Sequence, residues 1–123
     1  YRGPVGFWDR AYSVFRDSAM FVGSGDEHGT FQSLYGPIRY LPTADLLALA
    51  RAIAGCRALI GNQSSPWAIL EGLKGVGIQE TDRGSPNCVF PRPTAMHVIE
   101  PSGLDAAISW ATIERMETAC APP

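Results

Sequence analysis

The sequence of 123 residues has few charged side chains and no run of basic ones. Charged residues make up 18% of the chain, and the formal net charge is −2. Without a segment rich in Lys and Arg, the chain lacks the positive surface with which proteins hold nucleic-acid phosphates. We therefore expect no nucleic acid among its partners. With so few charges, we also expect some apolar surface to serve a partner.

Long hydrophobic runs and clustered cysteines are absent as well. No stretch approaches the roughly 18 consecutive apolar residues of a membrane-spanning helix, so we predict no membrane span. The cysteines Cys56, Cys88 and Cys120 lie far apart and form no C-x-x-C pair, so neither a metal site nor a disulfide scaffold is expected. No signal peptide is visible, and together with the separated cysteines this favours a reducing, cytoplasmic location. No Walker lysine is present, and we expect no cofactor.

Short apolar runs alternate with segments of helical periodicity. Hydrophobic residues make up 46% of the chain, which suffices for a folded core. This alternation indicates a parallel sheet with helices on both faces. We predict a single α/β domain over residues 1–123, Rossmann-like, with three α/β/α layers and a mostly parallel sheet of four or five strands. The expected strands are 19–22 (buried on both faces), 38–41, 58–60, 76–79 and 96–99, and the expected helices begin near Phe7, Asp26, Thr43 (an N-cap), Ser65 (an N-cap) and Pro101.

The segment Gly61-Asn62-Gln63-Ser64-Ser65-Pro66 carries the clearest sign of a binding site. A buried strand leaves through glycine, passes small polar residues and enters a helix. The first turn of a helix has free N–H groups and the positive end of the helix dipole, and nearby hydroxyl and amide groups complete a cradle for phosphate. The alternative is that Ser65 only caps the helix and that the preceding residues form a turn.

Glu71 and Arg92 are further candidates. Glu71 follows Ser65 by six residues on the same helix, where its carboxylate could accept hydrogen bonds from a sugar diol, or could simply be solvated. Arg92 stands between two prolines in a long loop over residues 82–95, where it could contact an anion or lie on the surface.

Residues 23–28, Gly-Ser-Gly-Asp-Glu-His, follow the first apolar strand. They approach the dinucleotide-binding pattern G-x-G-x-x-G, but His28 replaces the third glycine and no acidic residue ends the second strand. NAD binding is therefore rejected. His28 either contacts a ligand or has a structural role.

Residues 56–80, CRALIGNQSSPWAILEGLKGVGIQE, resemble the nucleotide-binding segment of GT-B glycosyltransferases. They are especially similar to bacterial glycosyltransferase-like proteins that are distantly akin to the heptosyltransferases. The similarity extends over AMFVGSGDEH, YLPTADLLALARAIAGC and PNCVFPRP, and so covers most of residues 7–100. The resemblance implies the C-terminal, donor-binding half of a GT-B protein, without the N-terminal half and without the first strand of the C-terminal half.

The resemblance also implies roles for individual residues. In the heptosyltransferase-like pattern an aspartate and a histidine occur roughly where Gln63 and Trp67 stand here. The acceptor site and usually the catalytic base lie in the N-terminal half, so no catalytic residue is assigned. Carried over by position, the contacts to the diphosphate come from Asn62, Gln63, Ser64 and Ser65, the contact to the ribose comes from Glu71, and Gly23 and Ser24 line the cleft.

Two functions remain open at this point. The chain is expected to be a glycosyltransferase-like domain that binds a nucleotide or nucleotide sugar, with little or no transfer activity alone. Its partner would be an N-terminal domain or a second copy in a homodimer, since the loss of a central strand leaves open sheet edges. The alternative is a non-enzymatic dimerisation or interaction module, which the low charge and the three tryptophans favour.

Overall fold

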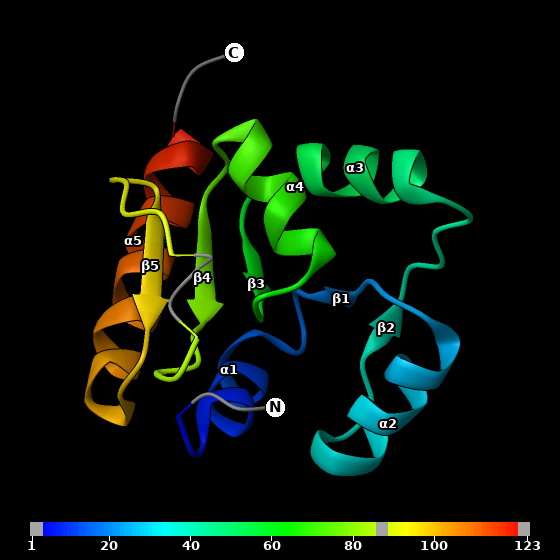
Figure 1. Cartoon of the computed structure of the whole chain (residues 1–123), viewed down its shortest axis with the longest axis horizontal. Helices are drawn as coiled ribbons and strands as arrows, with labels where there is room; N and C mark the ends of the chain where they lie inside the picture. Colours follow the sequence, from blue (N-terminus) through cyan, green and yellow to red (C-terminus); the bar gives the residue numbers. More distant parts are fainter. Residues whose placement is uncertain (1–3, 86–88, 121–123) are drawn as a thin grey trace.

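The computed structural model describes residues 4–85 and 89–120, which form five α-helices and five short strands (Figure 1). Within these residues, no helix combines the length and the apolar character that a membrane crossing requires. In chain order the elements are α1 (Phe7–Phe15), β1 (Met20–Phe21), α2 (Gly25–Tyr35), β2 (Arg39–Tyr40), α3 (Leu46–Gly55), β3 (Leu59–Gly61), α4 (Ser65–Leu73), β4 (Gly77–Glu80), β5 (Ala95–Val98), the 3-10 helix η2 (Pro101–Gly103) and α5 (Leu104–Cys120).

The strands form two parallel sheets. One has the order β3-β4-β5 and the other consists of β1 and β2. The predicted α/β class with parallel strands is confirmed. The five strands do not join in one sheet, however, because β1 and β3 are not hydrogen-bonded to each other.

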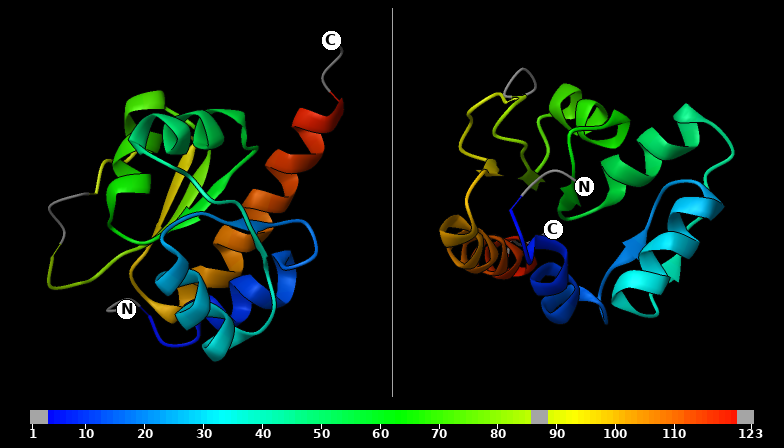
Figure 2. Two further views of the ribbon diagram at one scale, coloured as in Figure 1. Left: turned by 90° about the vertical axis from the view of Figure 1, so that its right-hand side faces the viewer. Right: turned by 60° about the horizontal axis from the view of Figure 1, so that its bottom comes forward.

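Two hydrophobic cores cover the two faces of the β3-β4-β5 sheet. Helices α1 and α5 lie against one face, and α3 and α4 lie against the other (Figure 2). The first core contains Phe7, Phe15, Ile78, Val98, Leu104, Ala107, Ile108 and Ala111, and the second contains Leu49, Ile53, Trp67, Leu70 and Ala95.

The β1-α2-β2 unit has an aromatic cluster centred on Phe31, which is 5% exposed, and Trp8 links this cluster to the first core. The run over residues 19–22 does form a strand, but the prediction that both of its faces are buried is wrong. Met20 is 53% exposed, because this two-stranded sheet is not enclosed as the larger one is. The rings around Phe31 are those of Trp8, Tyr12, Phe21 and Tyr35, with centroids at 5.8, 6.3, 5.3 and 4.8 Å.

Two helices begin one or two residues away from the predicted caps. Asp45, not Thr43, caps α3, because its carboxylate accepts a hydrogen bond from the Ala48 N–H at 2.8 Å. Helix α4 has Ser64 at its N-cap and Ser65 inside its first turn, and the Ser64 side chain makes no capping bond. The amino end of α4 therefore keeps free polar groups.

Candidate functional site

The carboxyl ends of β3, β4 and β5 meet at one edge of the sheet, at the lower end of Figure 1. Residues 61–66 leave β3 at this edge and enter α4, and residues 81–85 leave β4 beside them. In open α/β sheets, ligands bind outside the carboxyl ends of the strands. The predicted phosphate cradle therefore lies at the edge where a ligand is expected.

Gln63 fixes the shape of this edge. Its side-chain oxygen accepts a hydrogen bond from the Asp82 N–H at 2.8 Å, and its amide donates to the Ser85 carbonyl at 2.6 Å. The Gln63 side chain, predicted to contact a diphosphate, is thus already used to join the loops that follow β3 and β4.

Ser64 donates to Asn62 through both its N–H and its hydroxyl, at 2.9 and 3.5 Å, whereas the start of α4 keeps unused donors. Ser64 and Ser65 are exposed. The first N–H that bonds within the helix is that of Ala68, which donates to the Ser64 carbonyl. In the described part of the chain, the N–H groups of Ser65 and Trp67 have no acceptor, as is usual for the first turn of a helix.

Glu71 and Arg92 form a nearly buried ion pair. Arg92 Nε lies 3.0 Å from Glu71 Oε2, and the side chains of Glu71 and Arg92 are 10% and 12% exposed. Arg92 also donates to the Gly75 carbonyl and to Thr94 Oγ1. The two residues predicted to contact a nucleotide therefore contact each other, and they join the carboxyl end of α4 to the residues before β5.

Ser24 caps α2, and the carbonyl of Gly23 accepts a hydrogen bond from the Tyr40 hydroxyl at 3.0 Å. Ser24 Oγ accepts from the Glu27 N–H, and Glu27 Oε2 accepts from the Ser24 N–H at 2.8 Å, which forms a capping box. The hydrogen bonds from the Ser24 backbone and side chain hold the pKa of the Glu27 carboxyl below its ordinary value. Among the described residues, no hydrogen bond or ion pair joins residues 23–28 to residues 61–66.

His28 packs within the β1-α2-β2 unit. Its ring stacks on Tyr40 with centroids 4.5 Å apart, and its Nε2 donates to the Ile38 carbonyl at 3.0 Å. These contacts favour the structural role over the ligand role.

Sequence reasoning missed a buried polar network at the end of β4. Gln79 and Thr81 are fully buried, and Thr81 Oγ1 donates to Gln79 Oε1 at 3.1 Å. His97 Nδ1 lies 2.7 Å from the same Gln79 oxygen, and His97 Nε2 lies 3.2 Å from the Phe90 carbonyl. The polar run at residues 79–81, at the end of an apolar strand, was the signal available in the sequence. The network holds the loop before β5 against β4.

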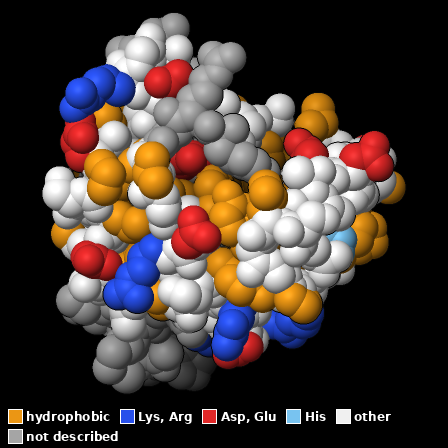
Figure 3. All heavy atoms as spheres, turned by 90° about the horizontal axis from the view of Figure 1, so that it is seen from below, with side chains coloured by type: hydrophobic (Ala, Val, Ile, Leu, Met, Phe, Trp, Pro, Cys, Tyr) orange, Lys and Arg blue, Asp and Glu red, His pale blue; other side chains and the backbone are white. Residues whose placement is uncertain are grey.

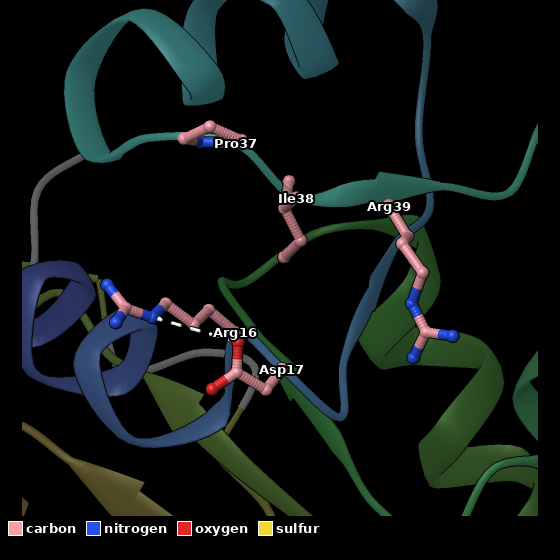
Figure 4. A pocket seen from close by; sticks show the side chains of 5 residues that line it. All are labelled: Arg16, Asp17, Pro37, Ile38 and Arg39. Carbon is pink, nitrogen blue, oxygen red and sulfur yellow. Dashed lines mark ion pairs between the residues drawn. The ribbon is translucent and has the colours of Figure 1, made fainter.

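A shallow hollow of about 450 Å³ lies at the carboxyl end of α1, away from the cradle (Figure 4). Arg16 pairs with Asp17 there at 3.9 Å, and Figure 4 shows the guanidinium groups of Arg16 and Arg39 pointing in different directions. Because polar groups do not converge in it, the hollow is a weaker candidate than the cradle. It is lined by Arg16, Asp17, Pro37, Ile38 and Arg39.

The described side chains do not form a metal site. Over the described ranges, no group of three or more His, Cys, Asp or Glu residues could hold a metal ion. The Cys56 thiol donates to the Ile53 carbonyl at 3.0 Å, and partial burial raises its pKa, so it is a protonated thiol near neutral pH.

Comparison with protein-family models, with curated proteins and with solved structures finds no match to this chain. The similarity to GT-B glycosyltransferases remains a prediction from the sequence.

Proposed function

We propose that the chain binds the phosphate groups of a nucleotide or nucleotide sugar at residues 61–66 and the amino end of α4. The observation that carries the proposal is the unpartnered N–H of the exposed Ser65, with that of the buried Trp67 behind it, at the carboxyl edge of a parallel sheet. These groups and the helix dipole favour an anion. The exposed Ser65 hydroxyl supplies a further donor, and so does that of Ser64 once it leaves its long 3.5 Å bond to the Asn62 carbonyl.

The loop is well prepared for this role. The two hydrogen bonds of Gln63 tie the loop after β3 to the loop after β4, which limits the freedom of residues 61–66 without a ligand. A preformed loop loses less conformational entropy on binding, so more of the contact energy contributes to affinity. Gln63 is accordingly a positioning residue, while Asn62, Ser64 and Ser65 are the proposed contacts.

The proposed site differs from the family resemblance at the sugar of the nucleotide. The backbone of Glu71 lies about 9 Å along the helix axis from that of Ser65, because six residues separate them and an α-helix rises about 1.5 Å per residue. The Glu71 Oε2 is engaged by Arg92, and its Oε1 is buried without a hydrogen-bond partner, away from the amino end of α4. The proposed site therefore assigns the phosphate contacts to this chain and leaves the ribose without a carboxylate partner from α4. Sugar transfer would need an acceptor site and a base from another domain, so the chain alone is expected to show little or no transfer.

A thermal-shift titration with UDP, GDP, CDP and ADP at millimolar concentration tests the proposal. A ligand that binds the folded state raises its stability by RT ln(1 + [L]/Kd). Ser65→Asp places a negative charge where the phosphate would sit, and an acidic side chain in the first turn of a helix does not harm the fold. We expect at least one nucleotide to raise Tm in the parent chain and not in Ser65→Asp.

Ser102→Asp is the matched control, because Ser102 is exposed in η2, just before the first turn of α5. It adds the same charge near a different helix start, and the nucleotide shift should survive. An absent shift with all four nucleotides, or an equal shift in Ser65→Asp, would contradict the proposal.

A second candidate function is an interaction module. Helix α3 exposes Leu46 and Leu47, which are 68% and 58% exposed, beside its buried Leu49. Adjacent exposed leucines favour a protein partner or a second copy. Size-exclusion chromatography with light scattering would detect a homodimer, and Leu47→Glu should then give a monomer. A monomeric parent chain would count against the homodimer form of this candidate.

A further inference from the structure

The exposed leucines of α3 belong to a wider apolar surface. Leu46 and Leu47 lie in the first turn of α3, and Leu73, at the end of α4, is 49% exposed. Helices α3 and α4 share one hydrophobic core, on the face of the β3-β4-β5 sheet opposite to α5 (Figure 2). Three large apolar side chains are therefore open to solvent on this layer of the molecule.

The exposed charges on the same layer all have one sign. Residues 46–79 contain the exposed cations Arg51, Arg57 and Lys74. Among the described residues, none of the three forms an ion pair with a carboxylate. The acid in this segment is Glu71, which is held in a nearly buried ion pair. The layer of α3 and α4 thus presents positive charge, although the net charge of the chain is −2.

The carboxyl end of the sheet carries charges of both signs. Figure 3, which views the molecule from the end at which β3, β4 and β5 finish, shows acidic side chains close to basic ones. At this end Arg83 pairs with Glu100, and Arg10 pairs with Asp105. The exposed cations here have carboxylate neighbours, whereas those of the α3 and α4 layer do not.

Helix α3 presents leucine and arginine on one outward face. Leu47 and Arg51 are four residues apart, so their side chains are neighbours on the helix surface, and both are exposed. The opposite face of the helix holds the buried Leu49 and Ile53. Figures 1 and 2 show α3 along the outside of the molecule. An outer helix is convex, so its exposed leucines form a ridge and not a groove.

A ridge of leucines among cations fits a lipid surface better than a protein. A partner helix is bound in an apolar groove, whereas protruding apolar side chains with basic neighbours are typical of helices that lie in the membrane interface. A second copy that offered the same surface would bring like charges together, which repulsion disfavours. We propose that α3 and the end of α4 bind an anionic lipid surface, with the two leucines of the first turn of α3 inserted among the head groups and the three cations near the lipid phosphates.

This surface is separate from the proposed phosphate site. Residues 61–66 lie at the carboxyl edge of the sheet, at the lower end of Figure 1, whereas α3 lies along the upper end. The cradle would therefore stay open to solvent while α3 rests on lipid. Binding through three cations and a few leucines is weak and reversible, and it does not depend on a nucleotide.

Co-sedimentation with lipid vesicles tests the proposal. The probes are vesicles of phosphatidylcholine alone and vesicles of equal parts phosphatidylcholine and phosphatidylglycerol. At about 0.1 M salt we expect the chain to bind the anionic vesicles at about millimolar lipid, and to bind phosphatidylcholine alone at least about 10-fold more weakly. At about 1 M salt, where the Debye length is about 3 Å, binding to the anionic vesicles should be lost.

Three variants locate the contact. Arg51→Glu should weaken binding to the anionic vesicles about 10-fold or more, because a repelled charge replaces an attracted one. Leu47→Ser should weaken it about 5-fold, because an inserted apolar side chain is removed. Arg83→Glu is the matched control, since it makes the same charge change at an exposed residue near the carboxyl edge, and it should bind like the parent chain. Circular dichroism checks that each variant is folded.

Three results would overturn the proposal. One is no binding to the anionic vesicles, and a nucleotide-induced rise in Tm in the same chain would then leave the phosphate site standing. Another is an equal loss of binding in Arg51→Glu and Arg83→Glu, which would indicate a general effect of net charge. The third is a parent chain that is dimeric by light scattering and becomes monomeric in Leu47→Ser, which would assign the surface to a second copy.

Discussion

The β3-β4-β5 sheet and the β1-α2-β2 unit are both parallel βαβ structures, but they bury their strands very differently. All four residues of β4 are buried, with helices on both faces of the sheet. In β1, Met20 is 53% exposed and Phe21 is half-buried. The apolar β1 is thus less buried than β4, which ends in Gln79 and Glu80, because the number of helices packed on a sheet decides how much of a strand is covered.

The comparison predicts two levels of stability in one chain. Substitutions around β4 should lower the free energy of global unfolding, since they disturb both cores. Substitutions in the β1-α2-β2 unit should chiefly open that unit, in a local transition that hydrogen exchange detects. The following experiments would sharpen the difference or remove it.

Glu71→Ala should have the largest effect. It leaves the guanidinium of Arg92 nearly buried without its carboxylate, which costs about 3 kcal/mol or more of unfolding free energy. Arg10→Ala is the control, because its pair with Asp105 is exposed, with side chains 52% and 80% accessible, and should cost less than about 1 kcal/mol. Urea unfolding measures both. If the β3-β4-β5 sheet and the β1-α2-β2 unit unfold in a single transition in Glu71→Ala, the two parts do not differ in stability as proposed.

Gly77→Ala should destabilise the chain by about 2–3 kcal/mol, through overpacking. An added Cβ would lie 2.6 Å from Leu70 Cδ2 and 2.8 Å from both the Leu59 carbonyl oxygen and a Trp67 ring carbon. Gly72→Ala is the matched control in α4, where a Cβ meets nothing within 4 Å, and it should stabilise the helix by up to about 1 kcal/mol. Thermal unfolding compares the two variants. Equal Tm values would contradict the tight packing of β3 and β4 beneath α4.

The smallest effect concerns acid and the start of α2. Hydrogen bonds from Ser24 hold the pKa of Glu27 below its ordinary value of 4.5. The ionised carboxylate therefore stabilises α2 above this ordinary value, and the contribution disappears as pH falls through the lowered pKa of the folded state. Amide exchange in α2 should accelerate, relative to β4, as pH decreases toward 3. In Glu27→Gln this extra acceleration should be absent, and its persistence would assign the acid sensitivity to another group.

The order of helices and strands was predictable because local signals mark it. Apolar runs that stop at or near Gly23 and Gly61, and proline near the start of α4, fix the alternation without knowledge of distant contacts. The separation of the sheets was not predictable from periodicity, since strand pairing depends on which edges meet in space.

The location of the candidate site was predictable from the sequence, but the hydrogen-bond partners of its side chains were not. The polar loop between β3 and α4 does lie at the carboxyl edge. Gln63 bonds residues that are 19 and 22 positions away, and Arg92 bonds Glu71 at a separation of 21. Such pairs form only after the strands are in register, so a polar residue suited to a ligand can equally be satisfied by the protein itself.

The position of α1 has a consequence for the order of folding. Its contacts with Glu80 and Asp105 close loops of 72 and 95 residues, whereas β3, α4, β4 and β5 follow one another closely along the chain. Closing a long loop costs conformational entropy before the stabilising contacts form. Folding should therefore nucleate in the β3-β4-β5 sheet, and α1 should dock late. Conservative truncations at Phe7 should then give lower φ-values than truncations at Ile78. Helix α1 precedes the other described helices along the chain, and it would be among the last of them to dock.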